Sequence, residues 1–227
     1  MKILAFDTAN SNNDVAILND GAILAQNSGE ISSSQAEMLI PMIEKSLKSA
    51  NIWYQDLDLI VTTKGPGNFT GIRIGFSVAK VIKAVTNIPL VALNNLEVLA
   101  YDYISDYEGN ILVVLDAKLE EFFIQEFVIS AKNLIPKYVD PKLIKQEEID
   151  DYLPESEFLI IGSGKEIAQK IITRKDFKIS EKADIIQAKN LALLAIENYK
   201  KDQKDFDEEI LYVRQPIITK PREPKCF

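Results

Sequence analysis

The two halves of this chain carry the same ordered pattern of apolar strands, carboxylates and glycines. Each half contains an apolar run that ends in Asp, "ILAFDTA" at 3–9 and "LVVLDAK" at 112–118. In each half a later strand breaks into glycines before a helix, in "LIVTTKGPG" at 59–67 and "LIIGSGK" at 159–165. Because these segments recur at nearly constant spacing, the sequence predicts an internal duplication. Two α/β lobes of about 100 residues each have an ordinary domain size.

The pattern also predicts where the lobes begin and end. We expect an N-terminal lobe at 1–104 and a C-terminal lobe at 105–215, each with a mixed sheet. The last helix of the second lobe could pack back on the first lobe, and 216–227 is expected to be a mobile tail. The first lobe should open with three antiparallel strands, because Asp20-Gly21 between two apolar runs is a strong hairpin signal.

Composition limits the class of protein. The chain has 227 residues, of which 47% are hydrophobic and 26% charged, as in a globular protein with a buried core. With a net charge of −8, the chain is not expected to have a basic surface that binds nucleic acid, so contact with RNA would need a basic partner. The N-terminal apolar run is interrupted by Asp7, and no stretch of about 18 apolar residues occurs. We therefore expect no signal peptide, no membrane contact and a cytoplasmic protein.

The chain contains no histidine and one cysteine, Cys226. The absence of histidine excludes Ser-His-Asp and Cys-His hydrolases and His-ligated zinc sites. A single cysteine excludes a disulfide framework. An enzyme of this composition would have to use carboxylates, lysines, tyrosines, hydroxyl groups or a bound metal.

The stretch "GPGNFTGIRIG" at 65–75 is the main candidate for a ligand-binding loop. Gly65 and Gly67 permit backbone angles closed to other residues, and N–H groups ahead of a helix favour an anion. The spacing matches neither of the two common phosphate loops. Gly71 and Gly75 are four residues apart, so the helix backbone can approach a neighbour there. Close packing and anion binding both remain open on these residues alone.

Asp7-Thr8 is the second candidate. A carboxylate and a hydroxyl at the end of the first strand could hold hydrated Mg²⁺ beside nucleotide phosphates, and the alternative is an Asp that caps a turn. The matching Asp116 favours a cleft between the lobes. The predicted nucleotide or phosphate site consists of Asp7, Thr8, Gly65, Gly67, Asp116, Gly162 and Gly164.

The first predicted helix offers a partner surface. Helical periodicity places one set of apolar residues on a single core-facing stripe: Ala36, Leu39, Ile40, Ile43, Leu47 and Ala50. Met38 and Met42 fall outside this stripe, which predicts an exposed, adaptable binding surface. The alternative is a groove that the second lobe fills. Arg73 is predicted to make a structural or partner contact. Glu120-Glu121 and the acidic run at 202–209 are predicted to be solvated charge.

Four segments together resemble the bacterial TsaB (YeaZ) family: "ILAFDTANSNNDVAIL", "GPGNFTGIRIG", "LDAKLEEFF" and "LYVRQP". They occur in the family's order along nearly the whole chain. The resemblance implies the two-lobed fold of actin, sugar kinases and heat-shock ATPases (ASKHA), in agreement with the duplication. It also implies a role with TsaD and TsaE in making threonylcarbamoyladenosine beside the anticodon of tRNAs that read codons beginning with A.

The resemblance further implies a subunit without catalytic residues. TsaD-like proteins carry two metal-binding histidines four residues apart in a stretch of the form N-H-x-E-x-H. Here the stretch reads "LNNLEVLA", with Asn95 at the first position and Leu99 or Val98 at the second. These side chains give no metal site.

On the same resemblance, the chain would scaffold and activate a TsaD-like paralogue. A TsaE-like ATPase would join the pair, and tRNA would be reached only through the complex. The first helix and the glycine-loop helix are the expected docking face, which would also support a homodimer when the chain is alone. We expect no tightly bound cofactor, with ATP or ADP held only in the complex.

Two other functions stay open at this point. One is an ASKHA-type Mg-nucleotide hydrolase or kinase that uses Asp7 and Asp116. The other is a glycoprotease of the M22 type, a label that TsaB-like chains share with TsaD.

Overall fold

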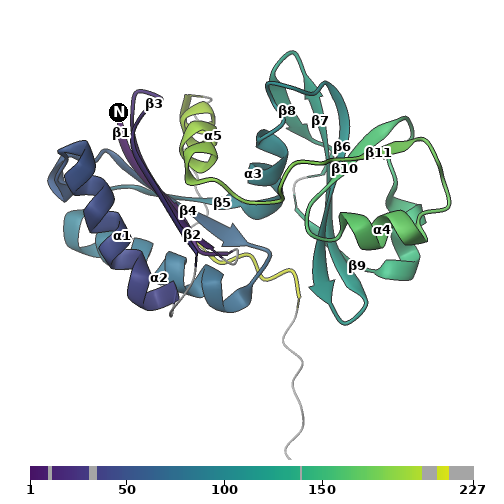
Figure 1. Ribbon diagram of the computed structural model, residues 1–227, viewed down its shortest axis with the longest axis horizontal. Coiled ribbons are helices and arrows are strands. Elements are labelled where there is room, and N and C mark those ends of the chain that lie inside the picture. Colours follow the sequence, from purple (N-terminus) through teal and green to yellow (C-terminus); the bar gives the residue numbers. More distant parts are fainter. Residues whose placement is uncertain (10–11, 31–34, 139, 201–208, 215–227) are drawn as a thin grey trace, which may run out of the picture.

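The computed structural model describes residues 1–9, 12–30, 35–138, 140–200 and 209–214, which form two α/β lobes (Figure 1). The elements built around the first sheet are β1 (Lys2–Asp7), β2 (Asn12–Asn19), β3 (Ala22–Glu30), α1 (Gln35–Ala50), the 3-10 helix η1 (Tyr54–Asp56), β4 (Leu59–Gly65), α2 (Phe69–Thr86), β5 (Leu90–Asn94) and α3 (Asn95–Tyr101). They are followed by β6 (Gly109–Lys118), β7 (Glu121–Ser130), β8 (Asn133–Pro136), β9 (Lys142–Lys145), the 3-10 helix η2 (Gln146–Tyr152), β10 (Phe158–Ile161), α4 (Lys165–Ile171), β11 (Phe177–Ile179) and α5 (Ala188–Lys200). None of the helices in these ranges is long and apolar enough to cross a membrane. The predicted tail at 216–227 lies outside the described residues.

The two sheets share one strand order, which confirms the predicted duplication. The first sheet runs β3-β2-β1-β4-β5, and the second runs β8-β7-β6-β10-β11 with β9 also paired to β7. In both sheets the first strand of the lobe is antiparallel to the next strand and parallel to the strand that precedes the glycines. The opening hairpin is also as predicted, because Asp20 and Gly21 both have positive φ, as its tight turn requires.

The helices cover the first sheet on both faces (Figure 1). α1 and α2 pack on one face, where Leu4, Phe6, Val15 and Ile17 of the sheet meet the helices. α5 packs on the other face, although it follows the second lobe in sequence. After the second lobe the chain therefore returns to the first sheet, and α5 joins the two lobes.

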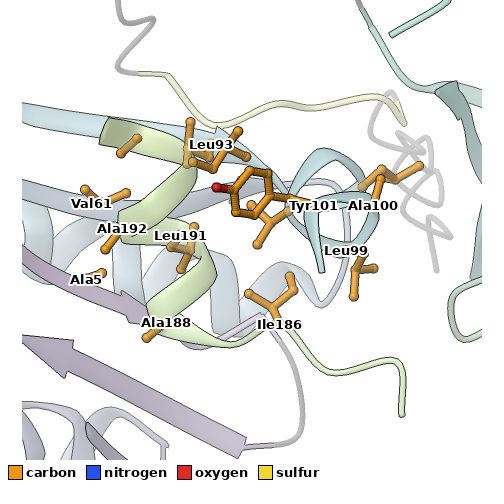
Figure 2. Packing of buried hydrophobic residues seen from close by; sticks show 14 of the residues in the cluster. Ala5, Val61, Leu93, Leu99, Ala100, Tyr101, Ile186, Ala188, Leu191 and Ala192 are labelled. Carbon is orange, nitrogen blue, oxygen red and sulfur yellow. The ribbon is translucent and has the colours of Figure 1, made fainter. Parts of the chain in front are cut away.

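A shared core holds the lobes together at α3 and α5 (Figure 2). Leu99 and Tyr101 of α3 belong to the same buried cluster as Leu191 of α5, Val61 of β4 and residues of β6 and β10. The Tyr101 hydroxyl donates a hydrogen bond of 2.7 Å to the Glu197 carboxylate. Burial first, and then Glu197, raise the pKa of Tyr101 above its ordinary value, so the hydroxyl stays protonated and able to donate.

The structure corrects the prediction for α1. Its buried residues are Leu39, Met42, Ile43, Ser46 and Leu47. Met42 is only 6% exposed and lies over Gly29 of β3, so the prediction that it belongs to an exposed pair is wrong. Ile40 is 48% exposed and lies outside the core stripe, while Met38 is exposed as predicted. The buried face is rotated relative to the predicted stripe, and the flexible Met42 side chain packs in the core beside Gly29.

Gly71 and Gly75 let α2 press against the end of β1, as their spacing predicts. A Cβ atom on Gly71 would lie 1.9 Å from the carbonyl oxygen of Thr8, and one on Gly75 would lie 2.5 Å from the Thr8 hydroxyl. The Thr8 hydroxyl donates a hydrogen bond of 2.7 Å to the Gly71 carbonyl. Of the two alternatives for these glycines, the structure supports close packing.

We predict that Gly71→Ala lowers the free energy of unfolding by about 2–3 kcal/mol or more, because the backbone of Thr8 cannot yield to the new methyl group. The gain in helix propensity of about 1 kcal/mol does not offset this clash. Urea denaturation measures the change. Gly29→Ala is the matched control: its Cβ would lie 3.6 Å from Met42, an ordinary contact, so a change below about 1 kcal/mol is expected. Equal stability of the two variants would contradict the packing.

Candidate functional site

Asp7 and Thr8 are buried at the end of β1 and are held by their own lobe. The Asp7 carboxylate accepts hydrogen bonds from the Thr63 hydroxyl at 2.7 Å and from the Ala9 N–H at 3.1 Å. The Thr8 hydroxyl donates its proton to Gly71. These are the contacts of a carboxylate that caps a strand end and ties it to β4.

Asp116 occupies the matching place at the end of β6, but it lies nearer the surface. Its carboxylate accepts from the Lys118 ammonium at 2.6 Å and from the Lys118 N–H at 2.9 Å. Partial burial acts to raise the pKa of Asp116, but the hydrogen bonds and charge of Lys118 outweigh it and lower that pKa below its ordinary value. Asp116 is therefore a stable anion in a local ion pair.

The glycines of the second lobe pack against β6, much as Gly71 packs against Thr8. A Cβ atom on Gly162 would lie 2.3 Å from the Val114 carbonyl oxygen. A Cβ atom on Gly164 would lie 3.1 Å from the Asp116 nitrogen. The Gly164 N–H donates to Val114 at 2.9 Å, and the Gly162 N–H donates to Asp184 at 2.8 Å. Both N–H groups thus already have acceptors within the protein.

Asn95 anchors the glycine loop. Its side-chain oxygen accepts a hydrogen bond of 3.0 Å from the Gly65 N–H, and a Cβ atom on Gly67 would lie 3.2 Å from its side-chain nitrogen. Val98 and Leu99 are buried in the core shared by the lobes. The positions at which the resemblance expects the histidines of TsaD-like proteins therefore hold a loop anchor and two core residues. The described residues contain no cluster of three His, Cys, Asp or Glu side chains that could hold a metal.

A segment at 210–214, here called the strap, was not predicted to have a role. The Leu211 N–H donates a hydrogen bond of 2.8 Å to the Lys64 carbonyl at the end of β4. Arg214 donates to the Ala117 carbonyl at 3.0 Å and pairs with the Glu121 carboxylate in the β6–β7 hairpin. The strap therefore connects the two lobes. Glu121 is half-buried in this ion pair, so its prediction as solvated charge is wrong.

The strap also meets the start of α2. The Tyr212 and Phe69 rings have centroids 5.7 Å apart, and the Arg73 guanidinium lies 3.7 Å from the centre of the Phe69 ring. Arg73 also donates to the Tyr212 hydroxyl at 3.4 Å. In the sequence analysis, "LYVRQP" contributed only to the family resemblance. Its contacts join residues far apart in the chain, so local periodicity gave no signal for them.

A cavity of about 750 Å³ opens where the two lobes and the strap meet. Its described lining consists of Pro66, Gly67, Phe69, Ile72, Arg73, Ala117, Phe123, Ile210, Leu211, Tyr212, Val213 and Arg214. Of the seven residues predicted for a nucleotide or phosphate site, Gly67 is the one that lines it. The structure does not bring all seven around this cavity, and most of them instead support packing at the strand ends.

Comparison with known proteins now adds to this geometry. A family model described as TsaD, tRNA N6-adenosine threonylcarbamoyltransferase, matches residues 29–211. The tRNA threonylcarbamoyladenosine biosynthesis protein TsaB of Buchnera aphidicola subsp. Schizaphis graminum (strain Sg) is 30% identical over 165 residues, which are 71% of this chain and 78% of that protein. The chain belongs to the TsaB family. The match to the TsaD model also places it among TsaD-related proteins.

Two further relatives agree with membership of the TsaB family. TsaB of Bacillus subtilis (strain 168) is 33% identical over 118 residues, about half of each chain. The crystal structure of an uncharacterized Pseudomonas aeruginosa protein, with similarity to peptidase YeaZ, superposes with a TM-score of 0.82. That superposition covers 94% of this chain and 99% of the other, at 20% identity, and shows that the fold is shared.

We predict that Asn95→Ala lowers the free energy of unfolding by about 1–3 kcal/mol, because it leaves the buried Gly65 N–H without an acceptor. Urea denaturation, with hydrogen exchange at the Gly65 amide, measures the effect. Asn133→Ala is the control, since the Asn133 side chain donates to a carbonyl in an exposed turn. Unchanged protection of Gly65 in Asn95→Ala would contradict the anchor.

We also predict that Lys118→Met raises the pKa of Asp116 toward its ordinary value, as followed by NMR titration of the carboxyl carbon. A pKa lowered by folding adds stability above the unfolded-state value, and that stability is lost as pH falls through the folded-state value. In the variant, the free energy of unfolding should lose the part of its dependence on acid pH that comes from Asp116. Lys132→Met is the control, because Lys132 also has positive φ in a hairpin turn but makes no contact with Asp116. Equal pKa values in both variants would refute the pairing.

Proposed function

We propose that this protein is a subunit required, with a TsaD-like paralogue and a TsaE-like ATPase, for threonylcarbamoylation of tRNA. The modified base would be the adenosine 3′ of the anticodon in tRNAs that read codons beginning with A. The observation that carries the proposal is the match along 78% of a TsaB protein named for threonylcarbamoyladenosine biosynthesis. The reaction would take place in the cytoplasm. The tRNA would be reached through the complex, because the chain itself is strongly acidic.

We infer that this subunit does not itself perform the transfer. Asn95 supports the glycine loop where TsaD-like proteins would present a metal ligand, and Leu99 lies in the core. Asp7 and Thr8 are buried and hydrogen bonded within their own lobe. These contacts favour a structural use of the predicted site, with ATP or ADP held only in the complex.

Calorimetry of the isolated protein with ATP and Mg²⁺ separates the subunit from the hydrolase or kinase. We expect no tight binding to the isolated chain. Tight binding that Asp7→Ala abolishes would favour the enzyme. The M22-type glycoprotease has no supporting residue among the described contacts, and a chain without histidine lacks the base or metal ligands that a serine or zinc protease uses.

The α1–α2 face supports the docking part of the proposal. Ile74, Val78, Val81 and Val85 of α2 follow the alternating four- and three-residue spacing of helices that pack side by side. Val81 is 62% exposed and Val85 is 79% exposed, so the outer part of this stripe has no cover within the described chain. Exposed apolar residues in such a row are typical of a protein–protein interface.

The neighbouring helix α1 adds exposed apolar side chains, Met38 and Ile40. We propose that the TsaD-like paralogue docks on this α1–α2 face, and that the same face supports a homodimer when the chain is alone. A stable interface of this kind buries about 800 Å² per partner. Met42 is excluded from the interface because it belongs to the core.

The direct test of function is an in vitro modification assay with the two partners, tRNA and substrates, with and without this protein. We expect modification to fall to background when the protein is omitted and to return when it is added back. Modification at full rate in its absence would remove the functional proposal.

For the docking face, we predict that Val81→Glu with Val85→Glu abolishes capture of the TsaD-like paralogue in a pull-down, because two carboxylates would be buried in an apolar interface. Both side chains are exposed, so the fold should remain intact by circular dichroism. Leu119→Glu with Ile135→Glu is the matched control, since both residues are exposed apolar residues of the second lobe. If the variant with both glutamates in α2 still captures the paralogue, the docking proposal is contradicted.

A further inference from the structure

The cavity between the lobes has the size of a small-molecule site. Its volume of about 750 Å³ falls within the range of about 300–1,000 Å³ that is usual for ligand pockets. It is formed by the start of α2, the β6–β7 hairpin and the strap. It lies beside the strand ends, since Ala117 follows Asp116 directly, but neither Asp7 nor Asp116 is in its described lining.

The walls of the cavity are mostly apolar. Phe69, Phe123 and Tyr212 contribute aromatic rings, and Ile72 and Leu211 contribute aliphatic side chains. A flat aromatic body would find aromatic and aliphatic contacts there. The Phe69 and Tyr212 rings are tilted by 54° to each other, so they form an angled wall and do not fill the space by stacking.

The charged residues in the described lining are two arginines, although the whole chain carries a net charge of −8. Arg214 is neutralised by its ion pair with Glu121. Arg73 forms no ion pair with any described carboxylate, and its guanidinium is held over the Phe69 ring at 3.7 Å. A guanidinium that is already oriented by a ring can donate two hydrogen bonds to a carboxylate or phosphate at little cost in side-chain entropy.

The strap makes the site a preformed one. Leu211 is fixed to the first lobe by its hydrogen bond to Lys64, and Arg214 is fixed to the second lobe by Ala117 and Glu121. Tyr212 lies between these two anchors and reaches Arg73. The residues that would contact the ligand are thus positioned from three separate segments of the chain.

We propose that this cavity binds an amphipathic organic anion: a flat aromatic body that carries one carboxylate or phosphate. The body lies among Phe69, Phe123 and Tyr212, and the anionic group pairs with Arg73. This binding site is additional to the proposed role in tRNA modification and does not depend on it.

The test uses two fluorescent probes of one shape on the full chain. 8-Anilinonaphthalene-1-sulfonate is an aromatic anion, and N-phenyl-1-naphthylamine is its uncharged counterpart. We expect Arg73→Met to weaken binding of the sulfonate about tenfold and to change binding of the amine less than about twofold, since only the anion loses its charged partner. Tyr212→Ala should weaken both probes, because it removes an aromatic wall.

Lys80→Met is the matched control, as Lys80 lies on the same helix over the Phe76 ring and outside the described lining. It should leave the affinities of both probes unchanged. Arg73→Met that weakens both probes equally, or neither, would overturn the anion site. Competition with indole-3-acetate and with adenosine monophosphate then distinguishes a carboxylate ligand from a phosphate ligand. Failure of both to displace the sulfonate would overturn the assigned ligand class.

Discussion

The close approach of α2 to the end of β1 is the contact on which the first lobe depends. Gly71 has no side chain, so its carbonyl can accept the Thr8 hydroxyl proton at 2.7 Å while the two backbones touch. This contact fixes the start of α2 and therefore the loop before it, which Asn95 holds from the other side through Gly65. In this loop the Gly65 N–H, a donor that a phosphate could use, is already bonded to Asn95.

The second lobe repeats this glycine packing, but its strand-end carboxylate has a different environment. Gly162 and Gly164 press against β6 as Gly71 presses against β1, but the carboxylate at this strand end, Asp116, lies near the surface beside Lys118. The strap then crosses from β4 to the β6–β7 hairpin and completes a cavity that neither lobe contains alone. A duplicated fold has thus kept its strand-end packing and gained an interlobe pocket from a terminal segment.

Local patterns were sufficient to predict the duplication and the opening hairpin, because each depends on neighbouring residues or a fixed spacing. The spacing of Gly71 and Gly75 left close packing and anion binding both open, and the contact with Thr8 decides for packing. The exposure of Met42 was predicted wrongly, since its side chain packs against β3, a contact with a distant segment that the periodicity of α1 does not encode. The strap and its ion pair with Glu121 depend on contacts between distant segments, which periodicity does not encode. The predicted phosphate residues were chosen as one site, yet their structural contacts lie mainly within separate lobes.

We propose that the carboxylates at the strand ends serve structure and not catalysis. The most direct test is the rate of tRNA modification by the complex reconstituted with Asp116→Asn, at saturating concentrations of its partners. Asp116 lies near the surface in a local ion pair, so the variant should fold and assemble. We expect a rate within about twofold of the unmodified complex, whereas a fall of about 100-fold with the complex intact, as loss of a general acid or base would cause, would contradict the claim.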